Sequence, residues 1–87
     1  MPYEIFIERR AEKEFIRLPQ ETQNRIKLSI LNLKNNPRPA QVRKISGSKN
    51  YYRLRVGDYR IVYEVDDSQK KINIFRIRHR KEAYLNL

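Results

Sequence analysis

Residues 51–65 read YYRLRVGDYRIVYEV, and this stretch decides the fold more than any other part of the chain. β-Branched and aromatic residues dominate it on both sides of Gly57-Asp58, which is the composition of two strands joined by a tight turn. A two-residue connection with glycine in the first place fits a type II′ turn, whose twist matches the strands that it joins. The stretch therefore predicts a β-hairpin with strands at 51–56 and 59–65.

The rest of the chain completes one small α+β domain. Residues 3–8 and 71–78 have the composition of strands, and apolar residues recur at helical spacing in two segments that meet at Pro19. The order β-α-α-β-β-β predicts a small antiparallel-dominated sheet with a helical hairpin on one face, and a single domain over residues 1–87. We expect the chain from His79 onward to form a short helical turn or a tail.

The charge of the chain is strongly positive and unevenly spread. Twenty Lys and Arg against ten Asp and Glu give a net charge of +10. Residues 38–87 hold 13 of the basic and five of the acidic side chains, so this part alone carries +8. Concentrated positive charge on a small domain predicts a polyanionic partner, usually a nucleic acid. A basic surface that serves only solubility and an acidic protein partner remain alternatives.

The composition also speaks against several classes of protein. Without cysteine the chain has neither a disulfide scaffold nor a thiolate metal site, and its single histidine argues against a multi-histidine metal site. The longest apolar runs are three residues, which excludes a membrane span and the apolar core of a secretion signal. We therefore expect a cytoplasmic protein with no membrane partner that needs neither a metal ion nor a cofactor.

Three arginines are expected to meet on the sheet face that the helices do not cover. Side chains alternate along a strand, so Arg53 and Arg55 share one face while Leu54 points to the other, toward the core. Arg60 follows the hairpin turn, and its place in the alternation predicts the same uncovered face. Guanidinium groups match phosphate oxygens bidentately and keep their charge at any working pH. The alternative is that these arginines pair with Glu64 or are only solvated.

The end of the chain adds further groups to this predicted site. Histidine is the side chain that changes charge near neutral pH, so His79 could move protons there. Tyr84 offers a ring for stacking on a base, and a hydroxyl group. A structural histidine and a tyrosine that only anchors the tail remain the alternatives. The basic residues expected to contact the nucleic-acid backbone are Lys44, Lys49, Arg76, Arg78 and Lys81.

Three segments of the chain resemble the RelE/ParE superfamily of bacterial and archaeal type II toxins. The opening YEIFIERRAEKEFIRLP resembles the first strand and helix of the family, and YYRLRVGDYRIVYEVDD resembles its central hairpin. The ending IFRIRHRKEAY resembles the terminus of the RelE branch. The order and spacing of the three segments together carry the resemblance, which covers essentially the whole chain.

The resemblance implies an activity and partners. Toxins of the RelE branch enter the ribosomal A site and cut mRNA during translation, and a small acidic antitoxin wraps around them and silences them. Toxin and antitoxin together commonly repress their own operon, so we expect contact with operator DNA only through that complex. The positions that match the basic and aromatic site residues of the branch are Arg53, Arg55, Arg60, Arg80 and Tyr84, and His79 matches a histidine of some members.

Cleavage of this kind needs no cofactor, because RNA carries its own nucleophile, the 2′-hydroxyl group. The protein has to orient that group, remove its proton, stabilise charge at the phosphate and protonate the leaving oxygen. Some members have lysines at the positions of Arg53 and Arg55, and a lysine can give up a proton where an arginine cannot. We therefore expect His79 to be the general base or acid, with Tyr84 or a substrate-held water as second candidates.

Two other functions fit the same residues. A ParE-like toxin shares the fold and the basic character, but it inhibits DNA gyrase without nuclease chemistry. The ending HRKEAY and the three arginines favour the ribonuclease over this alternative. A module that binds RNA or an antitoxin without cutting is the third possibility.

Overall fold

The computed structural model describes residues 2–80, which form two helices and a five-stranded sheet. In chain order the elements are β1 (Glu4–Ile7), α1 (Arg9–Ile16), α2 (Gln20–Leu33), β2 (Val42–Lys44), β3 (Tyr51–Val56), β4 (Tyr59–Asp66) and β5 (Lys71–His79). This is the α+β class that the sequence predicts. The sequence does not predict β2, because three residues are too few for an alternating pattern.

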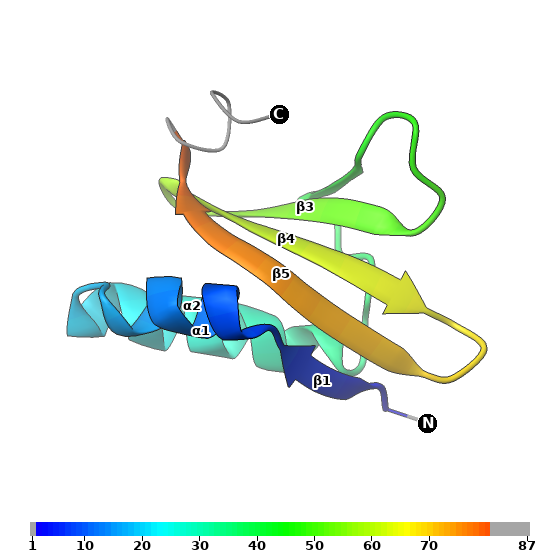
Figure 1. Ribbon diagram of the computed structural model, residues 1–87, viewed down its shortest axis with the longest axis horizontal. Helices are drawn as coiled ribbons and strands as arrows, with labels where there is room; N and C mark the ends of the chain where they lie inside the picture. Colours follow the sequence, from blue (N-terminus) through cyan, green and yellow to red (C-terminus); the bar gives the residue numbers. More distant parts are fainter. Residues whose placement is uncertain (1, 81–87) are drawn as a thin grey trace.

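The sheet has one covered face and one uncovered face. Its strands lie in the order β1-β5-β4-β3-β2. β1 pairs with β5 in parallel, and all other neighbours are antiparallel, as the sequence predicts for most of the sheet. Figure 1 shows both helices below the sheet, so neither of the two helices in residues 2–80 covers the opposite side. We call that uncovered side the open face. No helix within residues 2–80 is long and apolar enough to cross a membrane.

The β3–β4 hairpin turns at Gly57-Asp58, as predicted. Gly57 has a φ of +58°, whereas Asp58 has no positive φ, and a type II′ turn needs this combination. A Cβ atom at Gly57 would stand 3.1 Å from Nη2 of Arg25 on α2. Glycine therefore permits the turn and leaves room for the guanidinium group of Arg25.

The core lies between the helices and the sheet. α1 packs against β5 and α2 packs against β3. The helices bury Ala11 of α1 and the aliphatic row of α2, and the buried residues in all are Ala11, Ile26, Ile30, Leu33, Tyr52, Leu54, Ile61, Tyr63, Val65, Ile72, Ile74 and Ile77. Branched aliphatic side chains from the strands and one stripe of each helix therefore exclude water from a single cluster, which is the main stabilising contribution in a domain of this size.

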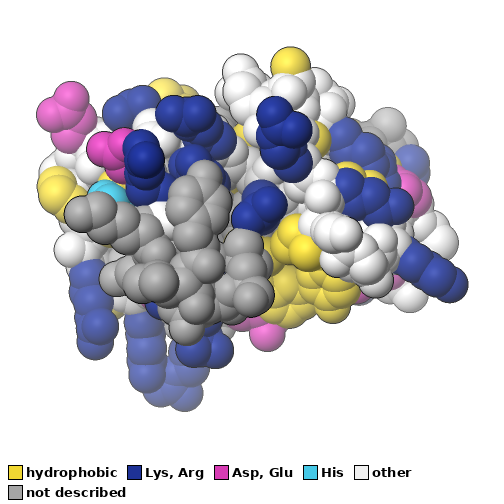
Figure 2. Space-filling model, turned by 90° about the horizontal axis from the view of Figure 1, so that it is seen from above, with side chains coloured by type: hydrophobic (Ala, Val, Ile, Leu, Met, Phe, Trp, Pro, Cys, Tyr) yellow, Lys and Arg dark blue, Asp and Glu magenta, His cyan; other side chains and the backbone are white. Residues whose placement is uncertain are grey.

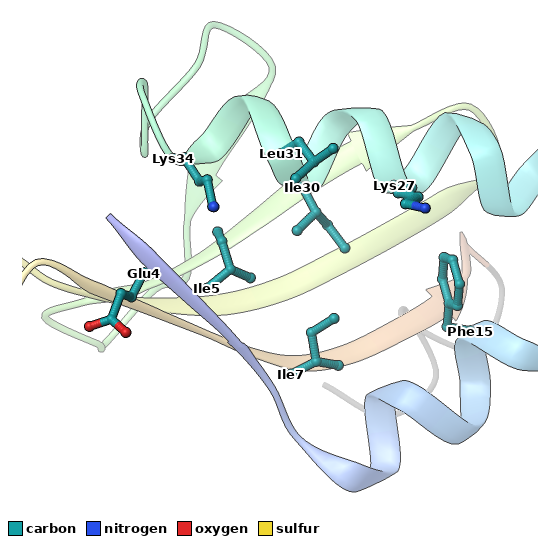
Figure 3. Close-up of a pocket in the computed structure, with 8 residues that line it drawn as sticks. All are labelled: Glu4, Ile5, Ile7, Phe15, Lys27, Ile30, Leu31 and Lys34. Atoms are coloured by element: carbon teal, nitrogen blue, oxygen red, sulfur yellow. The ribbon is translucent and has the colours of Figure 1, made fainter. Parts of the chain in front are cut away.

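An apolar groove remains where the helices diverge. Because α1 and α2 contact different strands, the groove opens between α2 on one side and β1 with α1 on the other, as Figure 3 shows. Its volume is about 510 Å³. The residues that line it are Glu4, Ile5, Ile7, Phe15, Lys27, Ile30, Leu31 and Lys34.

A β-bulge in β5 decides which side chains reach the open face. The register with β4 shifts between Ile74 and Arg76, which leaves Phe75 without a partner of its own. Ile74 before the bulge and Ile77 after it are both buried. Strict alternation from Ile74 would turn Arg76 into the core and Ile77 out of it. The bulge instead lets Arg76 and Arg78 follow Phe75 onto the open face.

A cluster of polar contacts closes the end of the sheet near the β4–β5 turn. Arg38, from the segment between α2 and β2, forms an ion pair with Asp67 in that turn, with 2.7 Å between Nη2 and Oδ2. Its Nε donates to the hydroxyl of Tyr52 at 2.9 Å, and the hydroxyl of Tyr3 donates to Oδ1 of Asp67 at 2.5 Å. The hydrogen bonds from Arg38 and Tyr3 lower the pKa of Asp67. Four chain segments that are separate in sequence are thus held together.

Candidate functional site

Arginines from three neighbouring strands line one cavity on the open face. Arg43 on β2 is level with Arg53 on β3, and Arg55 on β3 is level with Arg60 on β4. Residues that are level in an antiparallel pair point to the same face, so the four side chains share the open face. With residues 40–42 they line a cavity of about 480 Å³, which we call the arginine pocket. The expected convergence of Arg53, Arg55 and Arg60 is therefore confirmed.

Arg60 lies on the predicted face, but it is buried there. Only 8% of its surface is exposed, whereas Arg53 is half-buried and Arg55 is exposed. Nη1 of Arg60 donates to the carbonyl oxygen of Tyr59 at 3.1 Å and to that of Gly57 at 3.5 Å. Arg60 thus forms the floor of the arginine pocket. Its guanidinium group is held by the turn, so little reorganisation is needed when an anion enters.

Arg43 is a pocket residue that the sequence did not single out. It belongs to the three-residue strand β2, and nothing in its local pattern marks a face. The pairing of Arg43 with Arg53 brings it into the pocket. The pair of basic residues at 43–44 is the signal that could have pointed to it. That signal assigns no face to Arg43 until the register of β2 with β3 is known.

Arg76 and Arg78 share the open face, but both lie close to the carboxylate of Glu14 on α1. The carboxylate of Glu14 lies 2.6 Å from Nη2 of Arg76 and 4.0 Å from Nε of Arg78, and it accepts the backbone N–H of Ile77 at 2.9 Å. Burial alone would raise the pKa of Glu14, but the hydrogen bonds from Arg76 and Ile77 and the two positive charges outweigh burial and lower it. No local pattern indicates this ion pair, because its partners lie 62 residues apart in the chain.

His79 does not join the arginines, and this expectation was wrong. His79 is level with Tyr59 on β4, one position beyond the pair of Arg60 with Arg78, so its side chain points to the helix-covered side. Its ring meets that of Tyr59 edge-on, with 5.3 Å between centroids and 84° between planes. Adjacency in sequence to Arg78 and Arg80 placed His79 in the basic cluster, but alternation turns it away.

The remaining predicted residues are scattered. Lys44 is level with Tyr52, a core residue, so Lys44 lies on the helix-covered side and not with the arginines, which corrects its expected place. Lys49 is exposed in the loop before β3. Arg80 is exposed, and its backbone N–H donates to the carbonyl oxygen of Asp58 at 2.7 Å. The predicted residues Lys81 and Tyr84 lie outside the described residues.

The contacts within residues 2–80 speak against pairing of the arginines with Glu64. Glu64, the carboxylate named as a possible partner of the arginines, accepts a hydrogen bond from Nδ2 of Asn73 at 3.5 Å. The ion pairs of the open-face arginines within residues 2–80 are instead those with Glu14. In the same part of the chain, no group of three or more His, Cys, Asp or Glu residues could hold a metal ion. The four guanidinium groups that line the arginine pocket favour an anionic ligand.

Comparison with known proteins identifies the family. Residues 5–84 match the family model described as ParE toxin of type II toxin-antitoxin system, parDE. The chain belongs to the RelE/ParE superfamily of type II toxins. Toxin RelE3 of Methanocaldococcus jannaschii is 40% identical to this toxin over 76 residues, which cover 83% of this chain and 84% of that protein. Putative toxin RelE1 of the same archaeon is 33% identical over 89 residues, which cover 99% of both chains.

Solved structures agree with the fold of this RelE/ParE-family toxin. The toxin resembles a chain of the archaeal RelE–RelB complex from Pyrococcus horikoshii with a TM-score of 0.83 and 30% sequence identity. The match covers 92% of this chain and 97% of that chain. The family and the fold that the sequence predicts are therefore both confirmed.

Proposed function

We propose that this toxin is an endoribonuclease that cuts mRNA in the ribosomal A site during translation and so inhibits protein synthesis. The arginine pocket carries the proposal, because three adjacent strands supply four guanidinium groups to one cavity. The residues that line the pocket within the described part of the chain include no acidic side chain. A concave site of this kind suits the phosphates of a nucleic acid better than a neutral or cationic ligand.

The pocket suits a reaction in which the 2′-hydroxyl group of RNA attacks the adjacent phosphate. Negative charge builds up on the phosphate oxygens as the new O–P bond forms and the bond to the 5′-oxygen breaks. Arg53, Arg55 and Arg60 would stabilise that charge, and a well-placed donor of this type is worth about 3–4 kcal/mol. The products would be a 2′,3′-cyclic phosphate and a 5′-hydroxyl end. Arg80 would add a further positive charge from the end of β5.

The proton steps need a group other than His79. The His79 ring packs against Tyr59 on the side of the sheet away from the pocket, and an arginine cannot give up its proton. We therefore propose that the proton of the 2′-hydroxyl passes to Tyr84 or to a water held by the substrate, and that the leaving 5′-oxygen takes up a proton from a water molecule. The arginines, which make the attacked phosphate more electrophilic, would lower the demand on that base.

The family supplies the case for an antitoxin. The related Pyrococcus horikoshii structure is that of a RelE–RelB complex. We propose that a small acidic RelB-like antitoxin wraps around this chain, since a net charge of +10 suits an acidic segment that folds on binding. Contact with operator DNA would run through that complex. The toxin would act in the cytoplasm, where it meets ribosomes with mRNA in the A site.

A translation reaction tests the proposed activity directly. Purified toxin is added to ribosomes with a defined mRNA, and the 5′ ends of the RNA fragments are mapped with translation running and with initiation blocked. The proposal expects new 5′-hydroxyl ends inside the reading frame only while ribosomes translate. An mRNA that stays intact in the translating sample would refute the nuclease.

Gyrase inhibition is the second candidate, because the family model that matches residues 5–84 is that of ParE toxins. A supercoiling assay with purified DNA gyrase separates the two functions. Loss of supercoiling together with intact mRNA would select the ParE-like activity. Intact mRNA and unaffected gyrase would leave a binding module without catalysis.

A further inference from the structure

Two aromatic side chains meet on the open face beside the arginine pocket. The rings of Tyr51 on β3 and Phe75 on β5 have centroids 5.4 Å apart and are tilted by 34°. Because β4 lies between their strands, the rings lean toward each other across it. Tyr51 keeps 36% of its surface exposed. Figure 2 shows hydrophobic surface next to Lys and Arg side chains when the molecule is viewed from above.

Two separate features of the backbone present this pair, which we call the aromatic pair. Tyr51 precedes the buried Tyr52, so alternation along β3 turns Tyr51 away from the core. Phe75 is the extra residue of the β5 bulge, and the bulge keeps it on the open face. Neither ring fills the core, which lies on the other side of the sheet. The pair is therefore surface that a ligand can contact.

The aromatic pair stands one step along the strand from the arginine pocket. Tyr51 and Arg53 are two residues apart on the same face of β3, which is about 6.6 Å along a strand. Arg53 in turn is level with Arg43, so cationic groups begin where the aromatic surface ends. In a nucleotide, the flat face of the base lies at a distance from the phosphate that is similar to this spacing between Tyr51 and Arg53. The spacing of ring and guanidinium groups thus fits one nucleotide unit.

We propose that Tyr51 and Phe75 form a stacking subsite for a nucleobase of single-stranded RNA whose phosphate lies in the arginine pocket. The inference rests on the proposed function, because it takes the pocket as the phosphate site. Bases of single-stranded RNA stack on exposed aromatic rings, and stacking accepts every base because each has a π-face. The subsite therefore positions the substrate without choosing its sequence.

Binding to a short RNA that cannot be cut tests the subsite. The probe is a labelled 2′-O-methyl hexanucleotide, together with a set of the same oligonucleotides in which one base at a time is removed. With the wild-type toxin, affinity should fall most when one particular base is missing. Tyr51→Leu keeps apolar bulk but has no ring, so we expect affinity for the intact probe to fall about fivefold to a hundredfold. For Tyr51→Leu, removing that particular base should cause no further loss of affinity.

Three comparisons separate stacking from general damage. Tyr51→Phe keeps the ring and should bind nearly as well as the wild-type toxin. The salt dependence of binding should be the same for Tyr51→Leu as for the wild type, because the phosphate contacts remain. Phe6→Leu is the matched control, since Phe6 lies in the same row of the open face, 42% exposed and under Lys71, but at the far edge of the sheet. It should bind like the wild type.

The outcomes are distinguishable from failure of the proposed function. If Tyr51→Leu binds the intact probe as the wild type does, or if Phe6→Leu loses as much affinity as Tyr51→Leu, the stacking subsite is refuted. If affinities for the base-deleted probes are as expected but ribosome-bound mRNA stays intact, the nuclease proposal is refuted and the stacking subsite is supported. If mRNA is cut and Tyr51→Leu cuts it at the wild-type rate with unchanged binding, the subsite alone falls.

Discussion

Glu14 on α1 holds Arg76 on β5 with 2.6 Å between the carboxylate and the guanidinium group, and both side chains are only 21% exposed. The same carboxylate accepts the backbone N–H of Ile77 at 2.9 Å. At this point β5 has run past the end of β1, so the N–H has no strand partner on that side. Glu14 therefore joins α1 to the edge of the sheet and occupies a backbone donor that would otherwise be left without a partner.

Replacing Glu14 should destabilise the toxin. Glu14→Gln can still accept the N–H of Ile77, but it leaves the partly buried Arg76 without a countercharge. We expect the free energy of unfolding to fall by about 1–3 kcal/mol, as measured by urea denaturation. Glu12→Gln, on the exposed side of α1, is the matched control and should change stability by less than about 0.5 kcal/mol. Equal losses of stability in the two variants would contradict the stabilising role of the contacts that Glu14 makes with Arg76 and Ile77.

Acid should weaken the same contact. The folded-state pKa of Glu14 lies below its ordinary value of 4.5, so its stabilising contribution is complete above that value and is lost as the pH falls through the folded pKa. We expect the free energy of unfolding to decline on acidification below about pH 5. The decline should be shallower for Glu14→Gln, measured by urea titrations at a series of pH values. Parallel curves for the two proteins would show that Glu14 is not the group that titrates.

Arg55 should be needed for cleavage and not for folding. Arg55 is exposed and level with Arg60, so Arg55→Gln removes a repulsion and should leave the melting temperature equal or slightly higher. Cleavage of mRNA on translating ribosomes should fall about a hundredfold or more, because one group that stabilises the transition state is lost. Arg17→Gln, an equal loss of charge at the end of α1, should cut normally. Wild-type cleavage by Arg55→Gln would contradict the role of the arginine pocket.

His79 should matter for stability more than for chemistry. Its ring packs edge-on against Tyr59 away from the pocket, so His79→Gln should lower the free energy of unfolding by about 0.5–1.5 kcal/mol. Cleavage by the folded variant should stay within about threefold of the wild type. A loss of a hundredfold or more in a folded variant is the size expected for an acid–base group, and it would return His79 to that role.

The parts of the fold that could be predicted are those that depend on local pattern. The hairpin at residues 51–65 is set by alternation and by one glycine, and the positive φ of Gly57 agrees. The strand β2 was missed because its three residues acquire a face only through pairing with β3. The bulge at Phe75 was missed as well, because an extra residue in β5 is visible only against its partner strand.

The candidate site was predictable to the extent that it follows from single strands. Alternation placed Arg53 and Arg55 together, and the hairpin carried Arg60 to them. It did not reveal that Arg60 is buried, because alternation along one strand predicts the face of a side chain and not its exposure. The position of His79 shows the opposite error, since the same alternation, counted along β5, would have turned it away from Arg78.

The pairing of β1 with β5 links the two ends of the described chain. β5 is the last strand to be synthesised within residues 2–80, and β4 remains an edge of the sheet until β5 pairs with it. Contacts between segments so far apart in sequence form late in folding. The fold described for residues 2–80 therefore cannot be completed before residues 71–79 have been synthesised, although β1 at its other edge is made first.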